Sequence, residues 1–116
     1  MTSMPPKPEH IEIILNAFLD RHRPAEHIRP QWDMGGKVVG KTVEVFEIRP
    51  LWDNPKRVYR YPLARATWQN AKAAWKVSCL CDDLKWQDYS PKPLVASIEE
   101  FFDEVGNDRH GCFFGA

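Results

Sequence analysis

The sequence lacks the long hydrophobic runs that membrane-spanning helices need. No stretch of its 116 residues approaches the roughly 18 consecutive apolar residues of a membrane span. The first ten residues, MTSMPPKPEH, contain no apolar segment and are not typical of a secretory signal peptide. We therefore expect no association with a membrane, a disordered lead at residues 1–7, and a single domain at residues 8–116.

Cysteine and net charge are also scarce. Three cysteines, an odd number at irregular spacing, argue against a disulfide framework and favour a reducing cytoplasm. Sixteen Lys and Arg balance sixteen Asp and Glu, which excludes nonspecific attraction of polyanions by overall charge. The sequence has no glycine-rich phosphate loop, and neither Ser78 nor Ser97 lies in a nucleophile elbow. No cofactor is expected.

The sequence is rich in apolar residues, and its charges are unevenly distributed. Hydrophobic residues make up 43%, including five tryptophans and six phenylalanines, which is enough for a folded core. Residues 49–76 hold seven Lys and Arg and one Asp, whereas residues 80–108 hold two Lys and eight Asp and Glu. We expect an electrically polarised molecule, unless the fold interleaves these two segments.

Hydrophobic periodicity predicts helices at the two ends and strands between them. Apolar residues at helical spacing predict a helix over residues 8–22, and from Gln31 the period changes to two. A second apolar stripe, opened by residues 90–93, predicts a helix that ends at Gly106 as its C′ residue. Its stripe is formed by Leu94, Ile98, Phe101, Phe102 and Val105. The strands are expected from Gln31 to a Gly40-Lys41 turn, and at residues 42–48, 58–68, 73–81 and 84–89, with turns at residues 69–70 and 82–83.

This order predicts an α+β fold, a five-stranded antiparallel meander sheet with an N-terminal and a C-terminal helix flanking it. The helices are expected to cover one face. Asn54-Pro55 is expected to break the chain after the second strand. Pro62 predicts an edge position or a bulge, and Gly35-Gly36 reads as a bulge. The apolar end at residues 110–116 is expected to dock on the domain.

Several short segments carry a family resemblance. These segments are RP at 23–24, HIR at 27–29, Gln31, FEIRPLW at 46–52, Ala64-Arg65, Trp75, Trp86, Tyr89 and EVGNDRHGCFFG at 104–115. With them the chain resembles the small bacterial domain-of-unknown-function family numbered 3024, from about Phe18 to Gly115. The resemblance implies a compact stand-alone bacterial domain and no particular activity. Cys79, Cys81 and Cys112 are not part of the family pattern.

Glu47 and Arg49 form the first candidate site. Strand alternation places both on the face that carries Val43 and Val45, with Glu44 on the opposite face. One interpretation is a structural ion pair between Glu47 and Arg49 or an arginine of a neighbouring strand. The other is an enzyme in which Glu47 is the general base and Arg49 clamps an anionic substrate. Glu44 cannot easily serve as the second carboxylate.

The basic segment at residues 49–76 forms the second candidate site, because its cations interleave with aromatic residues. A sheet surface of this composition can stack bases and follow phosphates. The other interpretation is that its tryptophans are core and its lysines solvated. Alternation places Tyr59, Tyr61, Leu63 and Arg65 on one face and Arg60 on the other. The candidate binding residues are Arg49, Trp52, Lys56, Arg57, Arg60 and Arg65.

Three cysteines and a histidine form a candidate metal site. Cys79 and Cys81 share one face of a strand, and His110 and Cys112 could meet them if the tail crosses that strand. This spacing is not that of a standard zinc site, and the absence of these cysteines from the family pattern also argues against an essential metal. The other interpretation is that the cysteines are small buried thiols that fill gaps in the core.

The sequence most favours a noncatalytic binding module for an anionic partner such as nucleic acid. A protein-interaction module or homodimer that buries a sheet face or an edge strand is an alternative. The enzyme based on Glu47 is a third hypothesis. Which side chains stand on the sheet face that the helices leave open is the observation that best distinguishes these three hypotheses.

Overall fold

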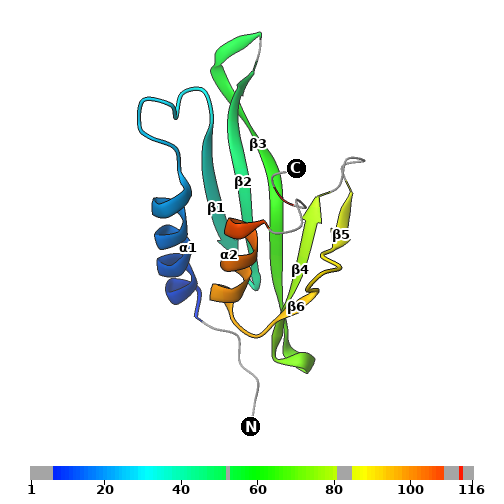
Figure 1. Ribbon diagram of the computed structural model, residues 1–116. Helices are drawn as coiled ribbons and strands as arrows, with labels where there is room; N and C mark the ends of the chain where they lie inside the picture. The colour runs from blue at the N-terminus through cyan, green and yellow to red at the C-terminus, as the bar shows by residue number, and fades with distance from the viewer. Residues whose placement is uncertain (1–6, 52, 81–84, 109–112, 114–116) are drawn as a thin grey trace.

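The computed structural model describes residues 7–51, 53–80, 85–108 and 113. Two helices flank a run of antiparallel strands (Figure 1). No helix in this part of the chain is long and apolar enough to cross a membrane. In chain order the elements are α1 (Pro8–His22), β1 (Asp33–Val39), β2 (Thr42–Leu51), β3 (Asn54–Gln69), a 3-10 turn (Asn70–Lys72), β4 (Ala74–Leu80), β5 (Trp86–Asp88), β6 (Leu94–Val95) and α2 (Ile98–Asn107).

The predicted α+β fold and its meander are confirmed. The first five strands lie side by side in chain order, and every pairing is antiparallel. A sixth strand, β6, pairs with β4 through Trp75 and Val95. It has only two residues and follows a proline-rich segment, so it lacked the alternation that identifies a strand from sequence.

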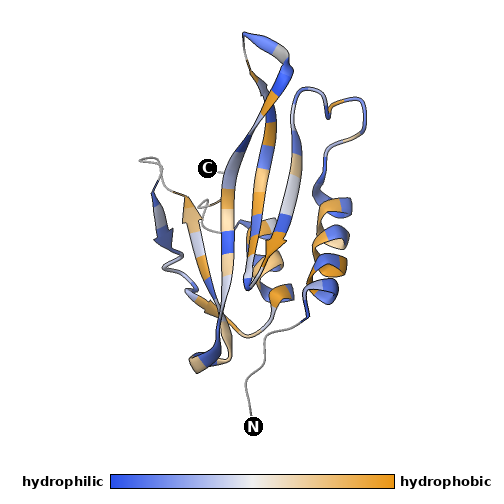
Figure 2. Ribbon diagram, turned by 180° about the vertical axis from the view of Figure 1, so that it is seen from behind, coloured by the Kyte–Doolittle hydropathy of each residue, from blue (hydrophilic) through white to orange (hydrophobic). Residues whose placement is uncertain are grey.

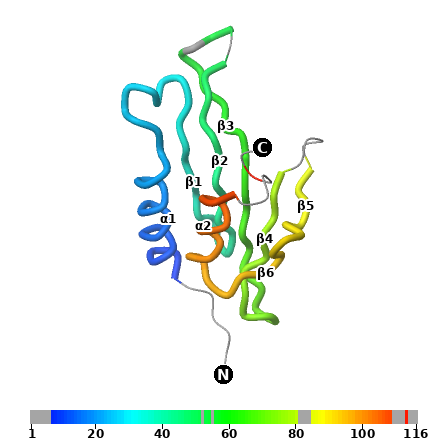
Figure 3. Tube along the Cα trace, viewed as in Figure 1, coloured from blue at the N-terminus to red at the C-terminus, as the bar shows by residue number. Residues whose placement is uncertain are grey.

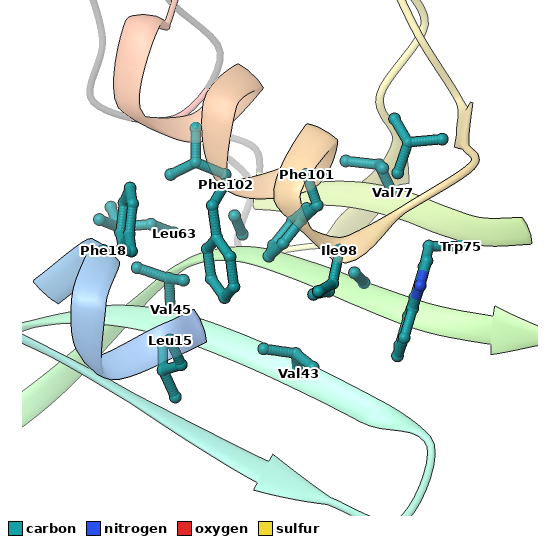
Figure 4. Close-up of a cluster of buried hydrophobic side chains, with 14 of the residues drawn as sticks. Leu15, Phe18, Val43, Val45, Leu63, Trp75, Val77, Ile98, Phe101 and Phe102 are labelled. Atoms are coloured by element: carbon teal, nitrogen blue, oxygen red, sulfur yellow. The ribbon is translucent and has the colours of Figure 1, made fainter. Parts of the chain in front are cut away.

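Both helices lie on one face of the sheet (Figure 1). Their apolar stripes meet strand residues in a single core, where Phe18 of α1 stacks on Phe102 of α2 with ring centroids 4.9 Å apart. Figure 4 shows this contact above Val45 and Val43 of β2. The core is built from residues of α1, α2 and strands β1 to β4 and β6, together with Tyr89 and Phe113, so the helices and the sheet stabilise one another.

The predicted bounds of α1 are confirmed. Pro8 occupies the first turn, where a missing N–H costs nothing, and Ile11, Leu15 and Phe18 are buried at helical spacing. The helix ends as Arg23, in extended conformation, donates its backbone N–H to the carbonyl of Leu19.

The glycine pair of β1 is not a bulge, and that prediction is wrong. Gly35 and Gly36 pair in register with Phe46 and Val45 of β2. A Cβ at Gly36 would lie 2.6 Å from Cδ1 of Leu15, and a Cβ at Gly35 would lie 2.7 Å from Cε2 of Phe46. The glycines are therefore required by close packing on the two faces of β1, which a sequence does not distinguish from a bulge.

The predicted irregularity at Pro62 is confirmed as a bulge. Phe46 pairs with Pro62, whereas the preceding Val45 pairs with Ala64, so Leu63 is the extra residue in β3. The bulge reverses the predicted faces, because one extra residue shifts the alternation. Arg60 and Arg65 therefore share the open face with Phe46, the reverse of the separation predicted from uninterrupted alternation.

The hairpin between β2 and β3 is longer than predicted. Asn54-Pro55 does not break the chain, because β3 begins at Asn54 and pairs there with Leu51. The next pair is Pro50 with Val58, so the ladder shifts register at residues 55–57. A proline is tolerated there because no ladder hydrogen bond needs its missing N–H.

Helix α2 begins later than predicted. Its N-cap is Ser97, whose hydroxyl accepts a hydrogen bond from the Glu100 N–H at 3.2 Å, and Leu94 lies in β6 instead. Gly106 is inside the helix, and Asp108 with φ 42° is the C-cap. A Cβ at Gly106 would lie 2.8 Å from Nε2 of His22, so this glycine allows the helices to approach.

The docking of the chain end is confirmed at Phe113. Its side chain is buried in the core and its ring centroid lies 4.8 Å from that of Tyr89. Its backbone N–H donates to Oδ1 of Asp108 at 3.0 Å. The predicted disordered lead, apart from Lys7, and the predicted turn at residues 82–83 lie outside the described residues.

Candidate functional site

The β2–β3 hairpin extends beyond the rest of the sheet as a two-stranded arm. We define the arm as the described residues 49–51 and 53–60. Pairing of β1 with β2 ends at Asp33 and Ile48, and pairing of β4 with β3 ends at Cys79 and Ala64. Beyond these pairs, β2 and β3 pair only with each other, and the arm projects past both neighbours (Figure 3).

The arm carries most of the predicted binding residues. Figure 2, seen from the side opposite the helices, shows hydrophilic residues at its end. Lys56, Arg57 and Arg60 are exposed, and Asp53 is the one carboxylate among its described residues. Trp52 was predicted to contribute, and it lies outside the described residues. Exposed apolar and aromatic side chains alternate with the cations: Val58 is 61%, Tyr59 41% and Tyr61 42% exposed.

Glu47 and Arg49 form an ion pair at the base of the arm. Nε of Arg49 donates to Oε2 of Glu47 at 2.6 Å, with side chains 50% and 13% exposed. The pair lies on the helix-side face, where Glu47 is flanked by Met34 of β1 and Tyr61 of β3. This is the structural ion pair that the sequence offered as one interpretation, and neither flanking residue supplies a second carboxylate.

Two arginines lie over aromatic rings on the open face. Cζ of Arg60 is 4.8 Å from the centroid of Phe46, and Cζ of Arg65 is 4.2 Å from the centroid of Trp86. A guanidinium held over a ring is fixed in orientation while its N–H groups still face outward. Arg65 lies on the body of the sheet, so the structure places it apart from the four cations of the arm and on the same face as Arg60.

The fold brings part of the acidic segment next to part of the basic segment. Near the opposite end of the sheet from the arm, Lys76 of β4 pairs with Asp88 of β5, with Nζ and Oδ1 3.3 Å apart. On α2, Glu100 pairs with Lys92 at 3.2 Å. The Lys76–Asp88 pair joins the basic segment to the acidic one, whereas Lys92 and Glu100 both belong to the acidic segment. The surplus of positive charge among the described residues of the basic segment remains on the arm.

The metal candidate is supported by none of the described residues. No three histidine, cysteine or carboxylate side chains in the described ranges are grouped to hold a metal ion. Cys79 is buried in the core beside Val77 and Ala64, as expected for a small side chain that fills a gap. Its proposed co-ligands, Cys81, His110 and Cys112, lie outside the described residues.

Sequence reasoning proposed no site role for three residues of the open face: Lys37 of β1, Glu44 of β2 and Trp86 of β5. Glu44 was considered only as a second carboxylate for Glu47. The strand register places Glu44 between Lys37 and Arg65. Trp86 was recognised only as part of the family pattern. Finding them from sequence would require the register of three strand pairs and the bulge in β3, which alternation within single strands does not provide.

The fold and this arrangement of side chains define a small α+β domain with one helix-covered sheet face and one open face. The chain belongs to the family described as Domain of unknown function (DUF3024), which matches residues 4–115. No curated protein and no solved structure is similar enough to the chain to count as a match.

Proposed function

We propose that the protein is a noncatalytic module that binds nucleic acid through the arm. The observation that carries this proposal is the arm itself, a protruding two-stranded ribbon with exposed Arg49, Lys56, Arg57 and Arg60. The cations of this surface repel one another, and none of the arm side chains that the structure describes contributes to the core cluster. We further propose a cytoplasmic location and a bacterial origin for the chain.

The shape of the arm suits a nucleic acid. The major groove of B-DNA, about 12 Å wide, admits a two-stranded ribbon. Cations on such a ribbon neutralise phosphates and release counterions, which supplies most of the affinity of nonspecific binding. Tyr59 and Tyr61 are about two-fifths exposed and lie on the same face of the ribbon as Arg49, and exposed rings beside cations stack on unpaired bases.

The geometry gives less support to the enzyme hypothesis. Glu47 is already bonded to Arg49, and its neighbours in the ladder are Met34 and Tyr61. Catalysis by a carboxylate base needs a concave site and a substrate proton within hydrogen-bond reach. Cavities lined by described residues lie beside the 3-10 turn and β6, between α1 and α2, and on the open face beside Arg65, and Glu47 lines none of these three.

Self-association is the second candidate, and the exposed Val58, Tyr59 and Tyr61 favour it. Val58 lies on the open face and the two tyrosines lie on the helix-side face, so a second copy that enclosed the arm from both faces would bury apolar area now in contact with water. Measuring the mass in solution by light scattering across a range of concentrations tests this candidate. A dimer that dissociates when Val58 and Tyr59 are changed to serine would support it, and a monomer at all concentrations would exclude it.

The test of the proposed function compares two charge variants in a fluorescence anisotropy titration with single- and double-stranded oligonucleotides at about 50 mM salt. The first variant combines Lys56→Ala, Arg57→Ala and Arg60→Ala. The matched control is Lys72→Ala, an exposed lysine in the turn at the other end of β3. We expect the triple variant to lose at least tenfold in affinity and the control to lose less than twofold.

No binding of either oligonucleotide by the unmodified chain would overturn the proposal. Equal losses in the triple variant and the control would also overturn it, because they would show that the arm has no special part in binding. Circular dichroism of both variants shows whether the fold is retained.

A further inference from the structure

A hollow on the open face of the sheet carries unpaired charges of both signs. It has a volume of about 240 Å³ and is lined by residues of β1, β2 and β3. Sites for drug-sized ligands usually exceed about 300 Å³, so this hollow suits one small ring system. The lining residues are Lys37, Val39, Thr42, Glu44 and Arg65.

The charged residues of the hollow occupy neighbouring positions on three strands. Lys37 pairs in register with Glu44, and Glu44 pairs with Arg65. Opposite charges in directly facing positions normally form cross-strand ion pairs. Here Glu44 makes no ion pair and no side-chain hydrogen bond with any described residue. Its carboxylate therefore remains available to accept hydrogen bonds from a ligand.

Arg65 does not pair with Glu44 because it is held elsewhere. Its guanidinium reaches across β4 and lies 4.2 Å from the ring centroid of Trp86 on β5. The plane of an arginine fixed in this way is a platform on which an unpaired base can stack. Val39, which is 64% exposed, supplies an apolar wall on the β1 side of the same hollow.

We propose that the hollow binds one unpaired guanine of a single-stranded nucleic acid. The base stacks on the guanidinium of Arg65, and Glu44 accepts hydrogen bonds from the two adjacent N–H donors of its Watson–Crick edge. Lys37 contacts a neighbouring phosphate. Guanine is favoured because a carboxylate with two free oxygens matches two parallel donors, whereas adenine and cytosine present a single amino group beside an acceptor.

This inference rests on the proposed function and sharpens it to one class of nucleic acid. The arm and the hollow share the open face through Arg60 and Arg65, which lie five residues apart on β3, about 16 Å at the usual rise of a strand. A single strand that contacts Arg60 through its phosphates can thus reach the hollow. In this proposal the arm provides affinity for nucleic acid of any sequence, and the hollow provides the preference for guanine.

The test uses single-stranded oligothymidylates with one central guanine, adenine or inosine, titrated by fluorescence anisotropy against the full chain. Inosine lacks the 2-amino donor and keeps the rest of the guanine edge. A good bidentate contact to a base discriminates by roughly five- to 150-fold. We therefore expect guanine to bind about tenfold more tightly than inosine or adenine.

Variants assign the preference to the hollow. Glu44→Gln should abolish the guanine preference and leave the affinity for the plain oligothymidylate within about twofold. Glu44→Asp, which keeps the charge and shortens the side chain, should reduce the preference in part. Glu99→Gln on the exposed surface of α2 is the matched control and should keep the full preference.

Each outcome decides the inference. Binding of all oligonucleotides with equal affinity would overturn the guanine site and leave the proposed function standing. A guanine preference that survives Glu44→Gln would also overturn it. No binding to any oligonucleotide would overturn both proposals, so the two failures are distinguishable.

Discussion

At the residue scale, two glycines set how closely the helices pack. Gly36 lies under Leu15 of α1, and Gly106 of α2 lies against His22 of α1. In both places a methyl group would come within 3 Å of a neighbouring side chain. Neither glycine has a positive φ, so the requirement is for space and not for backbone conformation.

Replacing Gly36 with alanine should destabilise the fold by about 1 to 2 kcal/mol. The added Cβ would also lie 3.0 Å from the backbone oxygen of Glu44, and overpacking of this kind usually costs about 1 to 3 kcal/mol. Part of that cost is offset because alanine has less freedom in the unfolded chain. Urea denaturation followed by circular dichroism measures the change.

The matched control is Gly40→Asn in the β1–β2 turn. Gly40 has φ +59° and open space around its Cα, and asparagine tolerates this conformation better than most residues. We expect a change below about 1 kcal/mol. A Gly36→Ala variant as stable as the unmodified chain would contradict the close packing described for α1 and β1.

Asp33 ties the end of α1 to the start of β1. Its two carboxylate oxygens accept hydrogen bonds from Nε and Nη2 of Arg23 at 2.9 and 2.6 Å, and the Met34 N–H adds a third at 2.8 Å. The hydrogen bonds from Arg23 hold the pKa of Asp33 below its ordinary value of 3.8. They stabilise the charged form in the folded chain, where Asp33 is largely buried.

Asp33→Asn should cost about 1 to 2 kcal/mol at neutral pH, because a largely buried charged hydrogen bond is lost. The folded pKa of Asp33 is lowered, so its stabilising contribution is complete above about pH 4 and is lost as the pH falls through the folded pKa. The difference in melting temperature between the two chains should therefore shrink below about pH 4. A difference that stays constant down to pH 2 would refute this linkage.

At the element scale, the bulge in β3 decides which side chains the open face presents. The extra residue, Leu63, is buried in the core, and Figure 4 shows it beside Phe18 and Phe102. Because of this one residue, Arg60 and Arg65 face the same side although their spacing is odd. The bulge thus places Arg60 of the arm on the same face of the sheet as the hollow beside Arg65.

Removing the arm should leave the fold intact. In the variant that we propose, residues 50–58 are replaced by Asn-Gly, which closes a two-residue turn on the Arg49–Tyr59 pair. None of the replaced residues whose side chains the structure describes belongs to the core cluster, so we expect a melting temperature within a few degrees of the original. Affinity for oligonucleotides should fall at least tenfold. A variant that unfolds would show that the arm is structural.

Much of the fold could be predicted because its signals are local. The stripe Ile11, Leu15 and Phe18 identifies α1, and alternation identifies β1 to β5 in antiparallel order. The predicted start of α2 was wrong because Leu94 has the spacing of the helical stripe although it lies in β6. β6 was missed because a strand of two residues is too short to show alternation, and only its pairing with β4, as between Val95 and Trp75, defines it.

Less of the candidate site could be predicted, because it depends on register. Composition identified the basic and aromatic character of the arm, and alternation paired Glu47 with Arg49 correctly. The contact of Arg65 with Trp86, however, joins β3 to β5 across an intervening strand. Such contacts follow from how strands are aligned, which no pattern within one strand contains.

At the scale of the whole molecule, the domain presents a stable body and a charged projection. The described carboxylates of α2 and β5 lie on or near the body, where lysines pair with two of them, and the arm extends away with its cations exposed. Although the formal net charge is +0, a polyanion would attract the arm more strongly than the body and would turn the arm toward itself. The position of the charges, more than their sum, supports the proposed function.

The salt dependence of oligonucleotide binding tests the central claim most directly. If the arm neutralises phosphates, the logarithm of the association constant should fall linearly with the logarithm of salt concentration. The slope should become less steep by about 2 to 3 when Lys56, Arg57 and Arg60 are changed to alanine, because each lost phosphate contact changes it by about 0.7 to 0.9. An unmodified chain that does not bind at about 50 mM salt, or a slope that the triple variant leaves unchanged, would contradict the account.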